Sequence, residues 1–207
     1  MAHIQLDLDG YTDLPEGKVA TVVTHLEMLE KPALKPIDRP DLTLERAGKI
    51  DITEYRALFK RVGEPWLWFG RLVMNDAELE VTLSKPTNEF YWAMKNGEPV
   101  GMLELDVAKE DEVTLSYFGL VPEAVGGGAG RWLMNHATSK AFSRPEVKRF
   151  WLHTCTGDSP QALQFYLRSG FKPFKRSIEV ADDPRLNEIL DRSCAPHIPF
   201  LPKGRAG

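Results

Sequence analysis

The fold of this 207-residue chain is decided by the sequence SYFGLVPEAVGGGAGRWLM, which runs from Ser116 to Met134. Its first residues continue an alternation of β-forming residues that begins at Val113. Four glycines then fall within five positions, the last of them Gly130, and apolar residues recur at helical spacing after them. The stretch therefore predicts a strand, a glycine-rich turn and a helix in direct succession.

The glycine-rich turn is suited to a phosphate group. A helix N-terminus leaves backbone N–H groups unpaired and carries about half a positive charge, and glycines let an anion approach the main chain. Two phosphate-binding loops do not fit. A P-loop continues with Lys and then Ser or Thr, whereas Arg131 and Trp132 follow Gly130; a dinucleotide fingerprint needs a third glycine where this chain has Arg131 or Leu133. A flexible connector without a ligand stays open as the alternative.

Immediately before the turn, the sequence predicts an antiparallel meander. β-Forming residues alternate over 90–94, 100–107 and 113–121. Asn96-Gly97 is a strong hairpin signal between the first two segments, and the polar residues at 109–111 supply the second turn.

Nearer the N-terminus the pattern is less decisive. The segment 18–29 has helical spacing of its apolar residues but a Val and Thr content that favours a strand, so both structures stay open. Three prolines make 31–40 a connector, and 41–46 alternates like a short strand. One apolar face predicts a helix over 51–61.

After the glycine-rich stretch, two strands flank another helix. Alternation predicts the strands over 147–156 and 171–180. The helix between them begins at Asp158-Ser159-Pro160, where a capping side chain precedes a proline, and ends at Gly170.

Composition predicts a globular protein of the cytoplasm. Hydrophobic residues make up 43% of the chain, and the net charge of −4 is too small to indicate a nucleic-acid or membrane partner. No apolar run is long enough to span a bilayer, and the first ten residues lack a signal-peptide pattern. The two cysteines, Cys155 and Cys194, are far apart, and the histidines show no metal-ligand spacing, so we expect neither a disulfide framework nor a metal site.

Two segments together resemble the GNAT acetyltransferase superfamily. The stretch 116–134 resembles its acetyl-CoA-binding motif, and DSPQALQFYLRSGF at 158–171 resembles its second signature, in the same order. Gly128 and Gly130 match the glycines of the first motif, whereas Val125 stands where the family has Gln or Arg. The similar region extends from about Phe90 to Val180.

The resemblance implies an α/β fold of the α+β type. A mixed, mostly antiparallel central sheet would carry helices on both faces, with two strands splayed apart beside the glycine-rich turn. We expect the acetyltransferase domain to span 41–182, with residues 1–40 as an N-terminal extension packed on it and 183–207 as a C-terminal helix or tail.

The resemblance also implies acetyl-CoA as the cofactor. Unpaired backbone groups at the end of the strand would bind its amides in the manner of an added strand, and the glycine loop would hold its pyrophosphate. The expected cofactor-binding residues are Phe118, Gly119, Leu120, Val121, Gly126, Gly127, Gly128, Ala129, Gly130, Arg131, Ser159, Ala162 and Phe165.

Transfer of the acetyl group needs an acid for the leaving thiolate and a route for the amine proton. Tyr166 occupies the position where the family commonly has a Tyr that protonates the thiolate, and a phenol pKa of ~10 lies near that of a thiol. The backbone N–H near Leu120 is expected to polarise the thioester carbonyl. Glu104, Glu112 and His153 are the candidate bases, and ordered water is the alternative to all three.

The aromatic residues Trp66, Trp68, Phe69 and Tyr91 are candidates for the acceptor pocket, because aromatic faces suit ammonium groups; core packing is equally compatible with them. The expected acceptor is an amine on a small molecule, peptide or protein, and a homodimer is compatible with the sequence. Two other functions stay open. One is a catalytically silent acyl-CoA-binding or sensor domain, and the other is transfer of another acyl chain or transfer to a hydroxyl.

Overall fold

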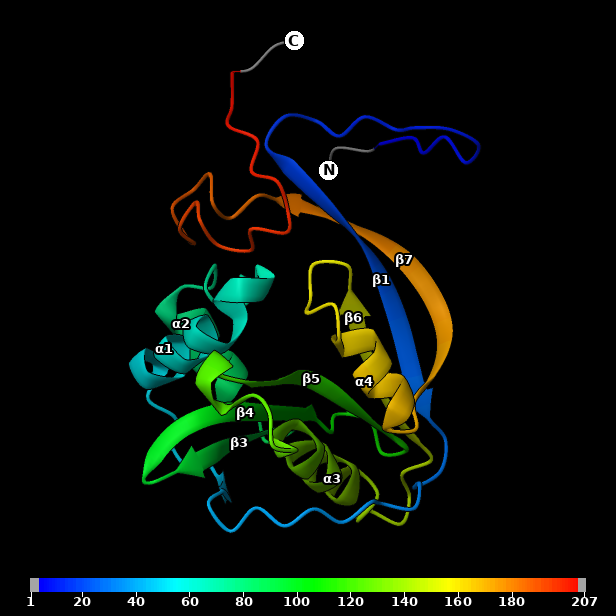
Figure 1. The fold of residues 1–207 in the computed structure, drawn as a ribbon, viewed down its shortest axis with the longest axis vertical. Helices are drawn as coiled ribbons and strands as arrows, with labels where there is room; N and C mark the ends of the chain where they lie inside the picture. Colours follow the sequence, from blue (N-terminus) through cyan, green and yellow to red (C-terminus); the bar gives the residue numbers. More distant parts are fainter. Residues whose placement is uncertain (1–3, 205–207) are drawn as a thin grey trace.

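The computed structural model describes residues 4–204, and a seven-stranded sheet forms the frame of this part of the chain (Figure 1). The strands lie in the order β2-β3-β4-β5-β6-β1-β7, and neighbours run antiparallel except for the parallel pair β5 and β6. The bounds are β1 Lys18–Met28, β2 Thr43–Arg46, β3 Asn88–Lys95, β4 Glu98–Asp106, β5 Glu112–Leu120, β6 Arg149–Cys155 and β7 Lys172–Asp182. The expected meander and the mostly antiparallel sheet are both confirmed.

Helices cover the two faces of the sheet. On one face lie α1 (Ile52–Gly63) and α2 (Asp76–Leu83), and on the other lie α3 (Ala129–Ala141) and α4 (Ala162–Arg168) (Figure 1). Short 3₁₀ turns, η1 (Glu64–Trp66) and η2 (Pro122–Ala124), follow α1 and β5. The fold class expected from the sequence is therefore confirmed.

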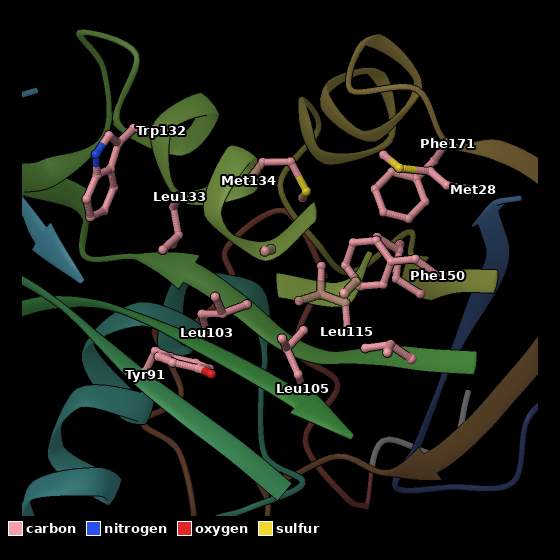
Figure 2. Close-up of a cluster of buried hydrophobic side chains, with 14 of the residues drawn as sticks. Met28, Tyr91, Leu103, Leu105, Leu115, Trp132, Leu133, Met134, Phe150 and Phe171 are labelled. Carbon is pink, nitrogen blue, oxygen red and sulfur yellow. The ribbon is translucent and has the colours of Figure 1, made fainter. Parts of the chain in front are cut away.

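The core beneath α3 explains why the glycine-rich stretch is followed by a helix. Leu133 is fully buried and Met134 nearly so, and both belong to a cluster that also includes Leu103 and Leu115 of the sheet and Phe150 of β6 (Figure 2). Burial of this apolar face, rather than helix propensity alone, holds the start of α3 against the sheet.

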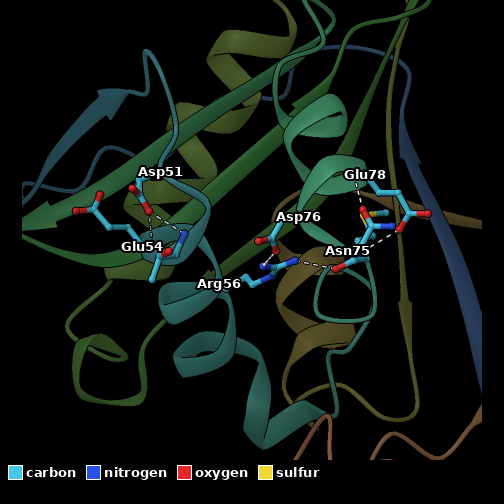
Figure 3. Close-up of polar contacts among 8 residues, drawn as sticks. Asp51, Glu54, Arg56, Asn75, Asp76 and Glu78 are labelled. Carbon is cyan, nitrogen blue, oxygen red and sulfur yellow. Dashed lines mark hydrogen bonds and ion pairs between the residues drawn. The ribbon is translucent and has the colours of Figure 1, made fainter.

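Side-chain caps fix the two helices on the other face (Figure 3). The Asp51 carboxylate accepts hydrogen bonds from the N–H groups of Thr53 and Glu54 at the start of α1. Asn75 and Glu78 form a capping box at the start of α2. Between them, Arg56 forms an ion pair with Asp76 and donates to the backbone of the same turn. The loop between α1 and α2 carries Trp66, Trp68 and Phe69 and is called the aromatic loop; its end before α2 is thereby anchored to α1.

The undecided segment 18–29 is strand β1, and it lies inside the sheet. It pairs antiparallel with β6 on one side and with β7 on the other, placing Thr21 opposite Glu179 and His25 opposite His153. Leu26 is fully buried and Met28 nearly so, so these two residues of β1 belong to the core. The expected N-terminal extension thus supplies a strand between two strands of the C-terminal half.

The segments before and after this frame also contact it. The connector after β1 passes along α3, where Asn135 donates to the carbonyl of Lys35 at 2.9 Å (Figure 1). The described part of the C-terminal segment, 183–204, consists of turns without helix or strand. Its residues Leu190 and Cys194 pack against Leu67 in the aromatic loop.

The strands β5 and β6 separate after a short paired region. Their parallel register covers only 112–114 against 149–151, after which β5 continues to Leu120 and β6 to Cys155 without pairing to each other. The splayed strand pair expected from the sequence is therefore present, and it opens a passage through the sheet.

Candidate active site

A cavity of about 640 Å³ lies in this opening. Its walls come from the separated parts of β5 and β6, from α4, from the aromatic loop after α1 and from β1 and β7. Phe118 and Phe165 belong to the apolar cluster on the α3 and α4 side, whereas Tyr117 and Trp68 belong to the cluster on the α1 side. The cavity thus runs through the sheet from one face to the other.

The glycine loop places free amide groups next to this cavity, whose lining includes Gly130. Gly126, Gly127 and Gly128 have φ angles of 111°, 53° and 83°, in the region that favours glycine. Within residues 4–204, the N–H groups of Gly127, Gly128 and Gly130 donate no backbone or side-chain hydrogen bond. They stand at the N-terminus of a thirteen-residue helix, so an anion would meet unpaired donors and the positive end of the helix dipole.

The last residues of β5 present one backbone edge to the cavity. On their other edge they are paired with β4, with Phe118 opposite Leu103 and Leu120 opposite Gly101. Val121 differs, because its N–H donates to the carbonyl of Val100 at 2.9 Å and its side chain is buried. The stretch 116–120 is therefore the part that can pair with an extended ligand.

Tyr166 points into the cavity from α4. Its ring packs edge-on against Phe118 and Phe171, with centroids 6.3 and 5.9 Å away. Among the described residues, its hydroxyl has no hydrogen-bond partner. Burial, and then the charge of Asp158, raise the pKa of Tyr166 above its ordinary value. Tyr166 consequently keeps its proton at neutral pH and is available as a donor.

Asp158 connects the second signature to the aromatic loop. Its carboxylate accepts hydrogen bonds from Trp68 Nε1 at 3.0 Å, from Thr154 Oγ1 at 2.5 Å and from the Cys155 N–H at 2.9 Å. The sequence indicated Asp158 only as a helix cap, and its contact with Trp68 is invisible until both segments are folded. This carboxylate fixes the indole at the cavity wall.

Neither of the two candidate glutamate bases lines the cavity. Glu104 is 1% exposed, pairs with Arg71 and accepts a hydrogen bond from Tyr55 at 2.9 Å. Burial, opposed by the Arg71 charge, raises the pKa of Glu104. Glu112 lies where β5 and β6 are still paired, and the ammonium of Lys109 at 2.7 Å lowers the pKa of Glu112. Both carboxylates are already engaged by cations.

The third candidate base, His153, does line the cavity, and its ring lies 5.7 Å from that of His25. Glu179 of β7 also lines the cavity and is, after Asp158, the second acidic residue in its wall. Glu179 belongs to no motif, and its position depends on the register of β7 against β1, so it could not be predicted from the sequence.

The aromatic candidates divide between two places. Trp66, Trp68 and Phe69 line the cavity, and Tyr117, which the sequence analysis did not single out, lies 5.4 Å from Trp68 in the same wall. Tyr91 lies elsewhere: it is buried in the core beneath α3, and its hydroxyl donates to Glu89 at 3.0 Å. Strand alternation explains the difference, since it turns Tyr91 away from the α1 face of β3.

The expected cofactor residues also divide. Seven of them line the large cavity, namely Phe118, Gly119, Leu120, Gly130, Ser159, Ala162 and Phe165. Ala129 is fully buried in the core, and Arg131 lines a second cavity of about 120 Å³ together with Lys35 and Arg168. Gly126 and Gly127 contact Arg39 of the connector instead.

An open, mostly antiparallel sheet with a glycine-rich helix start beside a splayed strand pair defines an acyltransferase-like architecture. Residues 52–171 match the acetyltransferase (GNAT) family. The chain therefore belongs to the GNAT family. A search of curated protein sequences found no match.

Solved structures share the fold at low sequence identity. A GCN5-related N-acetyltransferase from Sphaerobacter thermophilus has a TM-score of 0.58 and 16% identity, over 79% of this chain and 52% of that one. Another from Kribbella flavida has a TM-score of 0.53 and 19% identity, over 83% and 63%. Aminoglycoside N-acetyltransferase AAC(6')-Iy in complex with CoA has a TM-score of 0.50 and 19% identity, over 66% and 91%.

This chain therefore spans only about half to two thirds of the length of the first two of these relatives. At such identities the likeness concerns the fold alone. Within residues 4–204, no helix combines the length and the apolar character needed to cross a bilayer.

Proposed function

We propose that this protein transfers an acetyl group from acetyl-CoA directly to an amine. The observation that carries the proposal is the arrangement around one cavity: the open edge of β5, the N-terminus of α3 and the Tyr166 hydroxyl all adjoin the same space. These are the three parts that binding and breaking an acyl thioester would require.

The residues present fit coenzyme A along its length. The edge 116–120 suits the amides of an extended pantetheine arm, and the free N–H groups of the glycine loop suit its pyrophosphate. Beyond them, Lys35, Arg131 and Arg168 surround the smaller cavity and would favour a further phosphate. When bound, acetyl-CoA supplies the thioester that makes its acetyl carbon reactive.

Tyr166 is the residue that we assign as the general acid. The acceptor nitrogen forms the new C–N bond, the C–S bond breaks, and the sulfur takes the proton that Tyr166 holds. The phenol returns to its neutral form with the proton that the acceptor nitrogen releases through solvent. Its place in the cavity wall and its unpartnered hydroxyl favour this assignment among the described side chains of the cavity.

The lining of the cavity favours a cationic acceptor. Among the described residues that line it, Asp158 and Glu179 are acidic and none is Lys or Arg. Trp66 and Trp68 add aromatic faces, which attract ammonium groups. An amine that arrives protonated is therefore favoured over a hydroxyl, and His153 and Glu179 are the groups placed to receive its proton, directly or through water.

Cofactor binding and turnover test the proposal separately. We expect acetyl-CoA to raise the Tm of the protein, and a panel of amines with acetyl-CoA to give free thiol, detected by a thiol reagent. Release with matched alcohols but not with amines would contradict an amine acceptor. Binding without thiol release from any acceptor would support the acyl-CoA-binding or sensor function instead, and no Tm shift at millimolar acetyl-CoA would exclude both.

A further inference from the structure

The connector before β2 makes a direct contact with the glycine loop that neither GNAT signature includes. Nη1 of Arg39 donates to the carbonyl oxygens of Gly126 at 3.3 Å and Gly127 at 3.2 Å. The Arg39 side chain is only 16% exposed, although it belongs to a segment without helix or strand. An arginine that is distant in sequence thus lies against the loop beside the cavity.

Arg39 is held in this position by a second contact. Its Nε and Nη2 donate to the two carboxylate oxygens of Asp41, each at 2.8 Å, in a bidentate pair. The Lys95 ammonium lies 3.4 Å from the same carboxylate, so the three charged groups sum to one positive charge. Bidentate pairing fixes the plane of the guanidinium, and Nη1 is left to face the loop.

The contact with two carbonyls constrains where the neighbouring amides point, and the Gly126 carbonyl also accepts a hydrogen bond from the Ala129 N–H at 3.0 Å. In a planar trans peptide the C=O and the following N–H lie on opposite sides. Fixing the carbonyls of Gly126 and Gly127 on Arg39 therefore turns the N–H groups of Gly127 and Gly128 away from it. Successive N–H groups aimed to one side form a concave anion site.

The loop has no polar side chain of its own for this purpose. Residues 125–130 are Val-Gly-Gly-Gly-Ala-Gly, and the Val125 side chain is exposed. Ile37 of the connector also touches the loop, since a Cβ atom on Gly128 would lie 1.9 Å from its Cδ1. The contacts of Arg39 and Ile37 with the loop thus come from the same connector.

We propose that Arg39 is a positioning residue for the pyrophosphate of coenzyme A: by holding the carbonyls of Gly126 and Gly127, it presents the amides of the loop to the phosphates. The proposal rests on the proposed function, because it assigns the loop to the same cofactor. It makes the N-terminal connector a part of the cofactor site.

Amide NMR titrations of Arg39→Gln with CoA and with pantetheine, which lacks the phosphates, test this role. We expect the Kd of CoA to rise about tenfold, since charge-assisted hydrogen bonds that order the loop are lost, while the Kd of pantetheine stays within about twofold. Arg39→Lys should recover part of the loss. The matched control is Arg46→Gln, which removes another arginine paired with a carboxylate, that of Glu89, but makes no contact with the loop.

An unchanged Kd of CoA in Arg39→Gln, or an equal loss for CoA and pantetheine, would overturn the proposal. If that variant does not fold, Asp41→Asn replaces it, because it releases the guanidinium without removing it; a selective loss of about threefold for CoA is then expected, and no selective loss would overturn the proposal. A wild-type protein that binds neither compound would instead contradict the proposed function itself.

Discussion

At one side of the cavity, the backbone side, the groups that would face a ligand are main-chain groups: the edge of β5 at 116–120 and the free N–H groups at the start of α3. At the opposite side, the side-chain side, these groups are side chains from four separate segments: Trp66 and Trp68 in the aromatic loop, His153 on β6, Glu179 on β7 and Ile198 in the C-terminal turns. Backbone groups are common to all residues, whereas side chains are specific. The first side is therefore suited to a constant cofactor and the second to a particular acceptor.

Tyr166 lies between the two sides, and its removal should have the largest effect. We expect Tyr166→Phe to lower kcat about 100-fold, the range typical of a lost general acid, and to leave the Kd of CoA within about twofold. Stopped-time thiol release and calorimetry measure the two quantities. An unchanged kcat would mean that Tyr166 is not the acid. A Kd of CoA that rises as much as kcat falls would mean that Tyr166 acts in cofactor binding instead.

A change in the geometry of the glycine loop should weaken the binding of CoA at the backbone side. Gly128→Ala adds a Cβ to a left-handed residue and places it 1.9 Å from Ile37 Cδ1, so we expect a loss of CoA affinity of about 30-fold. Gly126→Ala is the matched control, because its φ is also positive but its Cβ would meet open space; a loss of about fivefold is expected. Calorimetry measures the Kd of CoA in both variants, and equal losses would contradict a role for the contact with Ile37.

The clash with Ile37 can be tested by a second change. Ile37→Ala in the Gly128→Ala protein should bring the Kd of CoA close to that of Gly126→Ala, because the remaining cost is then the backbone strain alone. A double variant as weak as Gly128→Ala would mean that the connector does not constrain the loop.

The same contrast explains what could be predicted from the sequence. The strand, glycine turn and helix of 113–142 are local features, and their order could be read from alternation, glycines and helical spacing. The place of Phe118, Gly130 and Tyr166 at the cavity was expected from the resemblance of two segments to the GNAT signatures, and they line it.

The acceptor side could not be predicted, because it depends on long-range register. The period of β1 did not distinguish helix from strand, and its place between β6 and β7 brings Glu179 to the cavity. Helix α2 escaped detection because its apolar residues do not share one face: Leu79 and Leu83 are buried whereas Val81 is 65% exposed. The capping box that begins at Asn75 is the local signal that indicates it.

A substitution on the side-chain side should affect the acceptor and not the cofactor. We expect Glu179→Gln to lower kcat/KM for the amine about tenfold, because a charge facing a cationic acceptor is removed, with the Kd of CoA unchanged. Asp182→Asn on the same strand is the control, since that carboxylate pairs with Lys18 and does not line the cavity. Equal losses in both variants would mean that the net charge of the protein, rather than the position of Glu179, causes the effect.

The smallest expected effect concerns the stability of the side-chain wall at alkaline pH. Burial, with the Arg71 charge opposing and that of Glu104 adding, raises the pKa of Tyr117 to about 12, above the ordinary value of ~10 that holds in the unfolded chain. Between these values the unfolded state loses the proton that the native state keeps, so the free energy of unfolding falls as pH rises through this window.

From pH 8 to pH 11 this one group should therefore remove about 1 kcal/mol of stability. Urea unfolding at both pH values measures the loss, and Tyr117→Phe should lose less than the wild type by that amount. Tyr11→Phe, at a fully exposed tyrosine, should behave like the wild type. If Tyr117→Phe and the wild type lose stability equally, Tyr117 is not buried in the cavity wall in solution, and the side-chain side is looser than the backbone side.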